Sequence, residues 1–413
     1  MSIDPQNNVS PPPLSERVTS EFNRRFLMND FVFPSPKFND RGIKKEVADL
    51  LIVLGQECVV LSIKGTDGKE KEESRFHNWL IKKDKKSRKQ LRGAFKTLKE
   101  REIVAYDGWG DIKIFAAGEL NILCGISLLE TTQSPFTPIA LDFKSKDLEP
   151  IIHSISLNDF LNLVMHLGSI KDLFEYLRIR SNFDCKIAGI NMEIGPLICF
   201  FSHEKGGDFD PLIPTSVYKK EYHEYMERHL YDHHLRQKRA DVINEMVHRL
   251  HNRAENLEEY FPEEFKSYLE PINDRKAYKE MATLLNSLPM SVKAGLGERV
   301  LKAIKDLEET ENCITHTDDL GSDHPLLHIA ICGNKGITRT NRIHFLHSSL
   351  IMKMHQKNRR DALGVAVSCV FSEGFDFSLV RNLNFSTEIN ELAKQHLPPF
   401  EIMGTDSFGR VLF

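Results

Sequence analysis

Three residues near the start of the chain have the side chains needed for phosphodiester hydrolysis. Glu46 and Asp49 lie three positions apart, and Lys64 ends an apolar run that follows Gly55. Carboxylate oxygens are ligands that Mg²⁺ prefers, and a bound metal polarises a phosphate and lowers the pKa of an attacking water. A lysine beside them would orient that water or neutralise developing charge. These residue types predict a Mg²⁺ or Mn²⁺ site with Glu46 and Asp49 as ligands and Lys64 as catalytic base or charge stabiliser.

A β-hairpin would bring Asp49 and Lys64 to the same end of a sheet. Residues 44–65 contain two apolar, β-branched runs separated by Gly55-Gln56-Glu57, which predicts a helix end followed by a hairpin. Asp49 then heads the first strand and Lys64 ends the second, so antiparallel pairing places them at one edge. Because side chains alternate along a strand, Ser62 shares the face of Lys64. Glu46 would lie at the end of the preceding helical segment.

A long basic helix is predicted after the hairpin. Residues 74–101 contain no proline, and apolar residues recur from Leu91 at i, i+3, i+4 and i+7. Ten basic residues stand against two acidic ones between positions 81 and 101. At helical spacing, six of them form a basic stripe about 25 Å long: Lys82, Lys85, Lys89, Arg92, Lys96 and Lys99. A stripe of one sign, with Lys86 beside it, favours contact with phosphates over the alternative of a solvated helix face.

The hairpin and the helix together resemble the PD-(D/E)xK nuclease superfamily, over about residues 40–160. The resemblance rests on Glu46, Asp49 and a strand that ends in Ser62-Ile63-Lys64. A helix after the lysine strand packs near the site in that superfamily, and its RecB-type branch carries a glutamine there, which Gln90 matches. The resemblance implies a restriction-endonuclease-like mixed sheet flanked by helices, and a metal site that includes the Ile63 carbonyl. It also implies a DNA substrate positioned by Gln90 and the basic stripe.

Two positions depart from the superfamily's pattern. Ala48 stands where proline is common, and Ser62 stands where glutamate or aspartate is usual. A serine hydroxyl is a neutral and weaker ligand than a carboxylate. Either Glu46 supplies the missing charge, or metal binding is weak, or the site is inactive. The acidic residues within 70–73 could substitute only if their polar loop folds back.

Three functions are compatible with these residues. The first is a metal-dependent DNA endonuclease or exonuclease, for which the resemblance implies a context of microbial restriction, antiviral defence or repair. The second is a nuclease-like fold that has lost its chemistry at Ser62 and uses the basic stripe to hold nucleic acid. The third is an interaction protein whose C-terminal domain recruits a protein partner. Motifs for phosphate loops, dinucleotide binding and nucleophile elbows are absent from the sequence, so we expect no ATP hydrolysis.

The composition is that of a packed, soluble protein. Hydrophobic residues make up 41% and charged residues 28% of the chain, which excludes collagen-like, disordered and membrane classes. The 55 basic and 59 acidic residues nearly cancel, so only local clusters could steer a polyanion. Seven scattered cysteines without a CxxC pair are expected to be reduced core residues. The N-terminal segment lacks the features of a signal peptide, and no apolar run could span a bilayer. We expect a cytoplasmic location and no membrane partner.

The length of 413 residues fits two or three domains. Residues 1–20 have the composition of a disordered leader. Strand and helix patterns alternate over residues 21–205, which predicts an α/β nuclease-like domain. The loop EKGGDFDPLIP predicts a boundary near residue 206, followed by a helical to α+β accessory domain over residues 206–413. A protein partner would bind through that second domain, and the sequence is also compatible with a homo-oligomer.

Further signals each allow two interpretations. His229 and His233, at i and i+4, have a spacing that binds zinc on a helix, but no third ligand is evident and a solvated helix is favoured. Phe76 and Trp79 could stack on bases or belong to the core. The basic run over residues 339–360 could extend a nucleic-acid surface or bind a partner, with a solvated helix face as the default.

Overall fold

The computed structural model divides the chain into two compact units, residues 1–234 and 235–413. This division falls after the boundary expected near residue 206. Of the expected leader, only Thr19 is described, and it is helical and buried. Apart from isolated residues and short strands, the structure describes residues 30–65, 73–107, 110–130, 150–182, 234–247, 274–307, 313–319, 325–333, 338–368 and 375–380.

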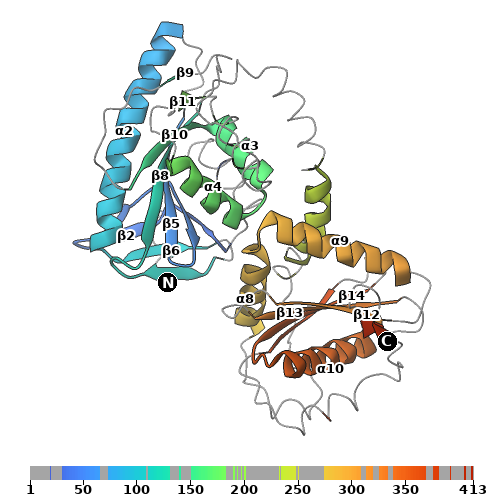
Figure 1. Cartoon of the computed structure of the whole chain (residues 1–413). Coiled ribbons are helices and arrows are strands. Elements are labelled where there is room, and N and C mark those ends of the chain that lie inside the picture. The colour runs from blue at the N-terminus through green and yellow to red at the C-terminus, as the bar shows by residue number, and fades with distance from the viewer. Residues whose placement is uncertain are drawn as a thin grey trace, which may run out of the picture. The chain divides into compact units, whose positions relative to one another are not determined.

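A mixed five-stranded sheet forms the centre of the first unit (Figure 1). Its strands, in spatial order, are β1 (Val32–Pro34), β4 (Leu50–Leu54), β5 (Glu57–Lys64), β8 (Asn121–Leu129) and β10 (Ile152–Ser156). The pairs β1–β4 and β4–β5 are antiparallel, whereas β5–β8 and β8–β10 are parallel. The predicted hairpin is therefore present as β4 and β5, which turn at Gly55 with a φ of 61°. Strands β8 and β10 fit the alternation of strands and helices expected over residues 21–205.

Helices cover both faces of this sheet. Helix α2 (Glu73–Glu100) lies on one face, where Leu91 packs in one core cluster with Val60 of β5. Helices α3 (Leu157–Leu167) and α4 (Ile170–Asn182) lie on the other, where Phe160 shares a cluster with Leu61 of β5. Figure 1 shows the sheet between these helices. The expectation of a mixed sheet flanked by helices is confirmed.

Local chemistry explains where these helices begin and end. The hydroxyl of Ser156 accepts a hydrogen bond from the backbone N of Asp159 at 3.0 Å and caps α3. Gly168, with a φ of 62°, ends α3 in the left-handed conformation that favours glycine. The apolar run LICFFSH, at residues 197–203, has the pattern of a strand, but Leu197 and Phe200, the residues of the run that are described, are helical. A short apolar run fits a buried helix as well as a strand.

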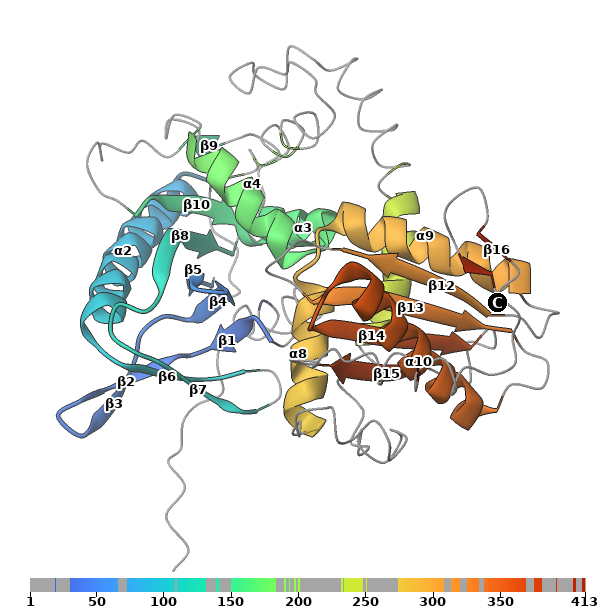
Figure 2. The ribbon, with the colours of Figure 1, turned by 60° about the horizontal axis from the view of Figure 1, so that its bottom comes forward.

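A second, antiparallel sheet of four strands corrects the prediction for Glu46 (Figure 2). Its strands, in spatial order, are β3 (Ile43–Glu46), β2 (Lys37–Asp40), β6 (Ile103–Tyr106) and β7 (Ile112–Phe115). Glu46 ends a strand and not a helix. The two-residue turn between β2 and β3 has positive φ at both Arg41 and Gly42, and the Asn39 side chain accepts a 2.7 Å hydrogen bond from the Gly42 N. Such a turn specifies a hairpin.

Two further short strands, β9 (Ile139–Ala140) and β11 (Gly189–Ile190), belong to the first unit.

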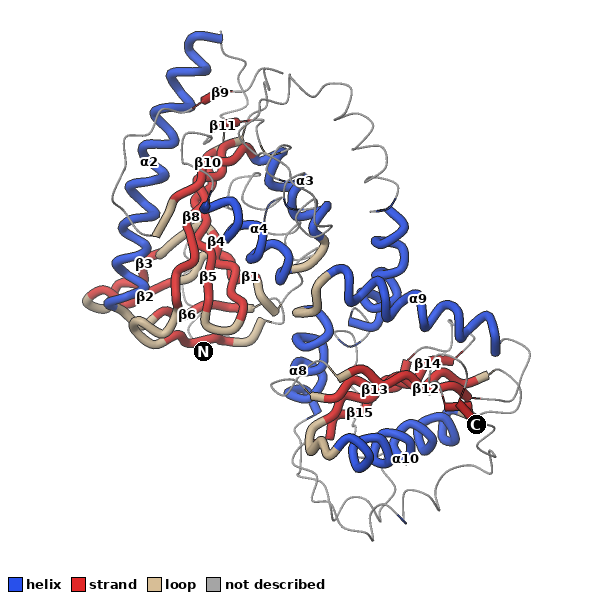
Figure 3. The backbone as a smooth tube through the Cα atoms, in the orientation of Figure 1, coloured by secondary structure: helices blue, strands red, loops and turns tan. Residues whose placement is uncertain are grey.

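The second unit combines helices with a six-stranded sheet, which agrees with the expectation of an α+β domain (Figure 3). Helices α8 (Asp274–Asn286) and α9 (Met290–Leu307) precede the sheet, and α10 (Arg339–Lys357) connects the parallel strands β13 and β14. In spatial order the strands are β15 (Phe375–Val380), β14 (Ala362–Ser368), β13 (Leu326–Cys332), β12 (Cys313–Asp318), β17 (Val411–Leu412) and β16 (Gly404–Thr405).

The described cysteines fit the expectation of reduced core residues. Cys58, Cys124, Cys313 and Cys332 are buried and free, as expected for core thiols. Burial raises the pKa of the Cys58 and Cys124 thiols to about 12. Within the described part of the chain, no helix is both long enough and apolar enough to cross a membrane.

Candidate functional site

The end of strand β5 brings three of the predicted site residues into contact. The β4–β5 register places Asp49, which directly precedes β4, opposite Ser62. Asp49 Oδ2 accepts hydrogen bonds from the Ile63 backbone N at 2.5 Å and from Lys64 Nζ at 3.2 Å. Lys64 Nζ also donates to the Ile63 carbonyl oxygen at 2.9 Å. The hairpin therefore holds a carboxylate, an ammonium and a carbonyl oxygen at one end of the sheet.

Glu46 adds a second carboxylate from the neighbouring sheet. Partial burial raises the pKa of the Glu46 carboxyl, and the negative charge of Asp49 raises it further, while Lys37 and Lys64 act in the opposite direction. A side-chain hydrogen bond between Glu46 and Asp49 contributes to the same rise in pKa. Two carboxylates this close repel each other when both are ionised. A proton on Glu46 relieves that repulsion, and a divalent cation would relieve it as well.

The donor set fits a Mg²⁺ ion. Mg²⁺ is commonly held by one or two carboxylates, with water and substrate phosphate oxygens completing an octahedral shell. Glu46 and Asp49 supply two carboxylates here, and the Ile63 carbonyl oxygen lies beside them through its bond to Lys64. Among the residues that the structure describes, no group of three or more His, Cys, Asp or Glu side chains could hold a metal ion. Solvent and substrate would therefore have to provide part of the coordination.

Gln90 approaches the same strand from helix α2. The Ser62 hydroxyl donates to Gln90 Oε1 at 3.4 Å, and the Ser62 carbonyl accepts from the Ser87 hydroxyl at 3.4 Å. Ser62 is buried beneath α2. The structure thus brings Gln90, Ser62, Asp49 and Lys64 to one place. Weak metal binding, expected because the Ser62 hydroxyl is a poorer ligand than a carboxylate, stays a prediction.

A buried ion pair beneath α2 was not anticipated. Arg88 Nε lies 2.8 Å from Asp84 Oδ2, and Arg88 Nη2 donates to the Ser154 hydroxyl at 2.8 Å. The Ser154 hydroxyl donates to Asp84 Oδ1 at 2.5 Å, so the three side chains close a ring. All three are buried, which removes Arg88 from the basic surface of the helix. The i, i+4 spacing of Asp84 and Arg88 in the sequence is typical of an ion pair on a helix. Ser154, the partner of this pair on β10, could not be identified from sequence.

The basic stripe lies on the exposed face of α2. Its six members are solvent-exposed, as is Lys86 beside them. One of them, Lys96, lies 3.9 Å from the Glu100 carboxylate. The opposite face of the helix carries buried residues such as Leu91, which packs against the sheet. Helix α2 therefore places Gln90 beside Ser62 and presents cations to solvent along most of its length.

The aromatic residues before the stripe belong to a small core. Phe76 is buried against Leu80 and Leu129, and its ring stacks on Trp79 with centroids 5.9 Å apart. Trp79 is half-buried, and Lys83 Nζ lies 5.6 Å from the centroid of its ring. The core interpretation of Phe76 is confirmed, so base stacking by this side chain is not proposed.

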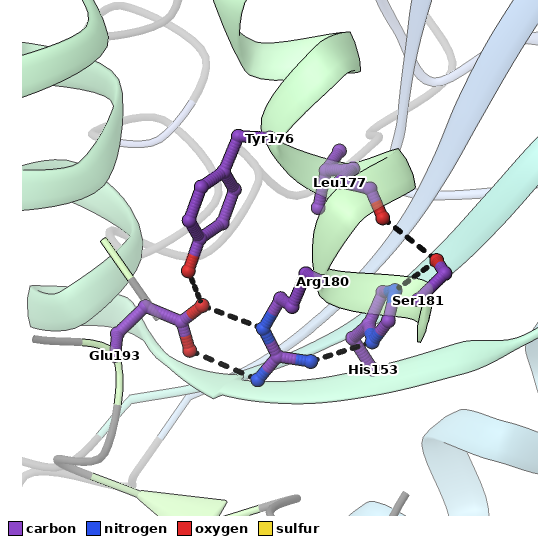
Figure 4. Close-up of polar contacts among 6 residues, drawn as sticks. All are labelled: His153, Tyr176, Leu177, Arg180, Ser181 and Glu193. Carbon is purple, nitrogen blue, oxygen red and sulfur yellow. Dashed lines mark hydrogen bonds and ion pairs between the residues drawn. The ribbon is translucent and has the colours of Figure 1, made fainter. Parts of the chain in front are cut away.

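A buried polar cluster braces the opposite face of the sheet (Figure 4). Arg180 of α4 binds both carboxylate oxygens of Glu193, at 2.5 and 2.9 Å, and Nη1 lies 2.5 Å from His153 Nδ1 on β10. The Tyr176 hydroxyl donates to Glu193, and Ser181 contacts His153 Nε2 at 3.2 Å. Burial drives the pKa of His153 well below its usual value, and the Arg180 charge lowers it further. The cluster joins β10, α4 and the chain at Glu193, which is a structural role.

The remaining sequence signals have structural roles or lie outside the described residues. Glu70, Glu72 and the pair His229 and His233 fall in the latter group, whereas Glu73, expected in the polar loop, begins α2. In the second unit, Arg339 Nε and Arg342 Nε bind the Asp376 carboxylate at 2.9 and 2.8 Å. Arg342 and Asp376 are buried, so this part of the basic run stabilises the fold. The default interpretation of a solvated helix face is wrong at Arg342, which is buried.

Comparison with known proteins identifies no relative of this chain. No protein-family model matches it, and no curated protein or solved structure matches it either. The geometry and chemistry of its own residues are therefore the basis for a function.

Proposed function

We propose that the first unit is a Mg²⁺- or Mn²⁺-dependent nuclease that hydrolyses phosphodiester bonds of DNA. The observation that carries the proposal is the convergence of Glu46, Asp49 and Lys64 at the end of β5. Two carboxylates and a lysine in contact are the minimum set for metal-assisted phosphoryl transfer to water. The restriction-endonuclease-like arrangement implied by the resemblance belongs to the same proposal, supported by a mixed sheet flanked by helices.

Each side chain has a separate task in the proposed reaction. Glu46 and Asp49 would hold the divalent ion, and the Ile63 N–H keeps the Asp49 carboxylate oriented. When bound, the ion polarises the scissile phosphate and promotes ionisation of water. Lys64, held 3.2 Å from Asp49 Oδ2, directs its remaining protons toward the attacking water or the phosphate oxygens. Because Asp49 and the Ile63 carbonyl both hold Lys64, the ammonium needs little reorganisation.

Helix α2 would deliver the substrate. Gln90 contacts Ser62 at the site, and the basic stripe extends along the same helix on both sides of it. Cations in a row neutralise successive phosphates of a polyanion and make its binding dependent on salt. A strand bound along the stripe would therefore lie on the helix that carries Gln90.

Cleavage assays with matched variants test the proposal. Purified full-length protein would be incubated with plasmid DNA, single-stranded DNA and RNA in Mg²⁺, Mn²⁺ or EDTA. We expect DNA cleavage in Mg²⁺ or Mn²⁺ but not in EDTA. The cleavage rate should fall by at least about 100-fold in Asp49→Ala and in Lys64→Ala. Lys302→Ala, at an exposed lysine of α9 in the second unit, is the control. Cleavage that persists in EDTA, or in both site variants, would contradict the proposal.

A nucleic-acid-binding module without cleavage is the second candidate. It is favoured by Ser62, which is neutral, buried and engaged by Gln90 where an acidic ligand is usual in the resembled superfamily. This candidate predicts salt-dependent binding and no cleavage with either metal. Metal-dependent cleavage by the wild type excludes it.

A further inference from the structure

The four-stranded sheet of the first unit exposes an apolar patch. Tyr106 of β6 and Ile112 and Ile114 of β7 keep 49%, 60% and 58% of their surface exposed. Tyr106 pairs with Ile112, and Val104 pairs with Ile114, so all four side chains lie on one face. We call these four residues the β6–β7 patch. Exposed apolar patches on a soluble unit commonly mark binding surfaces.

The other face of the same strands belongs to the core. Ile103 and Ala105 of β6 and Phe115 of β7 are buried in the cluster that includes Val60 of β5. Neighbouring residues of a strand point to opposite faces, and Lys113, at the edge of the side that carries Phe115, is exposed. Exposure of the patch is therefore a property of one complete sheet face.

The patch is continuous with the candidate site. Val104 pairs with Lys37 of β2, and Lys37 pairs with Glu46 of β3. A row from Ile114 through Val104 and Lys37 thus crosses all four strands and ends at the proposed metal ligand Glu46. Lys37 is close enough that its charge lowers the pKa of the Glu46 carboxyl. Figure 2 shows the four strands side by side. A molecule bound on the patch would reach the site without leaving the sheet.

Two features argue against a second copy of the chain as the occupant. Strand β7 is an edge strand, but it carries Lys113 at its centre between Ile112 and Ile114. Antiparallel pairing of two β7 strands about this centre would set Lys113 against its own copy, and like charges directly opposite are destabilising. The face itself has cations beside its apolar centre, namely the exposed Lys37 and Lys44.

Apolar and aromatic side chains flanked by lysines match an unpaired nucleic-acid strand. Unpaired bases offer flat apolar faces that stack on exposed aromatic rings, and their phosphates contact the cations around them. A duplex keeps its bases stacked inside and offers mainly phosphates to a surface. The basic stripe on α2 suits either form, whereas the β6–β7 patch is suited to unpaired bases.

We propose that the β6–β7 patch binds unpaired bases of a single-stranded stretch of nucleic acid and directs it to the site at Glu46. Tyr106 stacks on one base, Ile112 and Ile114 pack against its neighbours, and Lys37 contacts the backbone. The inference rests on the proposed function for the class of ligand. It deepens that function by naming a strand that is at least locally unpaired as the preferred substrate.

Binding measured without cleavage tests this proposal. The full-length protein would be titrated in EDTA against a fluorescein-labelled oligothymidylate and against a labelled hairpin duplex, with anisotropy as the readout. We expect Tyr106→Ala and the double variant Ile112→Ala/Ile114→Ala each to weaken single-strand binding by at least about fivefold. Duplex binding should stay unchanged. Ile43→Ala is the matched control, because Ile43 is 63% exposed on the same sheet but alternates with Lys44 and so lies on the other face.

The outcomes separate this proposal from the proposed nuclease. Single-strand affinity that is unchanged in Tyr106→Ala, or weakened equally in Ile43→Ala, would overturn the patch assignment. So would a wild-type dimer in light scattering that Ile112→Ala/Ile114→Ala converts to a monomer, since the patch would then be a protein interface. Failure to cleave any substrate would count against the nuclease alone, because binding in EDTA does not require the reaction.

Discussion

The carboxylate of Asp49 and the ammonium of Lys64 lie 3.2 Å apart, although 15 positions separate them along the chain. Both side chains are largely shielded from solvent, with exposed fractions of 17% and 13%. The same Asp49 oxygen accepts the Ile63 N–H, so the ion pair is held by backbone as well as by charge. Pre-arranged charges of opposite sign beside a second carboxylate are suited to binding a metal and a phosphate together.

Replacing Ser62 with glutamate is expected to strengthen metal binding. The new carboxylate, on the strand that ends at Lys64, would add to those of Glu46 and Asp49. A third hard anionic ligand raises affinity for Mg²⁺ and Mn²⁺. Calorimetric titration with Mn²⁺ and the plasmid cleavage assay measure the effect. Ser62→Gln is the control of matched size without charge. Equal Mn²⁺ affinity in Ser62→Glu and Ser62→Gln would mean that position 62 does not face the metal.

Removing the Glu46 charge should stabilise the metal-free protein at neutral pH. The folded-state pKa of Glu46 is raised above its usual value of 4.5, so the folded state holds this proton more tightly than the unfolded state. Stability is therefore lost as the pH rises from about 4.5 through the raised pKa. In EDTA, Glu46→Gln should melt at a higher temperature than the wild type at pH 7. The difference in melting temperature should disappear below about pH 4.5, the usual pKa of the Glu46 carboxyl.

The affinity of the site for Mn²⁺ should rise with pH over the same range in which the metal-free protein loses stability. A proton and a divalent cation compete for the Glu46 carboxylate, so wild-type Mn²⁺ affinity falls on acidification through the raised pKa. This part of the pH dependence should be absent in Glu46→Gln. Glu102→Gln, at an exposed carboxylate next to β6, serves as the control. If Glu46→Gln and Glu102→Gln show the same pH profile as wild type, Glu46 is not a ligand.

Neutralising the basic stripe should weaken nucleic-acid binding at low salt. In the quadruple variant Lys82→Gln/Lys89→Gln/Arg92→Gln/Lys96→Gln, exposed cations are removed without touching the buried face of α2. The slope of log affinity against log salt concentration should become shallower by roughly 0.7 to 0.9 for each phosphate that the variant no longer neutralises. Lys302→Gln/Lys305→Gln, which removes two exposed lysines of α9, is the control for loss of charge outside the stripe. An unchanged slope would show that the stripe is only a solvated helix face.

Breaking the Arg180–Glu193 pair should destabilise the protein strongly. Both side chains are buried, and removal of one partner leaves a charge without compensation, at a cost of about 3–5 kcal/mol. Urea unfolding of Arg180→Met and Glu193→Gln measures this cost, and the double variant should lose less than the sum of the two. Arg178→Ala, which removes partly exposed ion pairs on the same helix, should cost less than about 1 kcal/mol. Equal costs for Arg178→Ala and Arg180→Met would refute the brace.

Local patterns were sufficient for the elements that carry Asp49, Lys64 and Gln90. Apolar runs on both sides of Gly55 predicted the β4–β5 hairpin, and the 3.6-residue periodicity predicted α2 within one residue at each end. A tight hairpin leaves only one edge at which its two ends can meet, so the proximity of Asp49 and Lys64 followed from topology. The alternation of side chains also placed Ser62 on the face of Lys64.

Glu46 shows where local patterns were insufficient. Its strand is specified by the turn at Arg41 and Gly42, but that strand has no apolar face of its own, and the sequence pattern predicts a helix end there. Its sheet is completed by β6, which lies beyond α2 in the sequence and pairs with β2 through Lys37 and Val104. Pairing between distant strands depends on sheet order, which residue alternation does not encode.

Local sequence was enough to predict the residue types at the candidate site, the hairpin that joins Asp49 to Lys64, and the charge along α2. Three other features required the folded chain: Glu46 lies on a second sheet, Arg88 is buried with Asp84 and Ser154, and the β6–β7 patch is continuous with Glu46. The difference lies in how far apart in the sequence the interacting residues are. Periodicity and turns depend on residues within a few positions, whereas burial of a charge and the order of strands depend on which distant segments pack together.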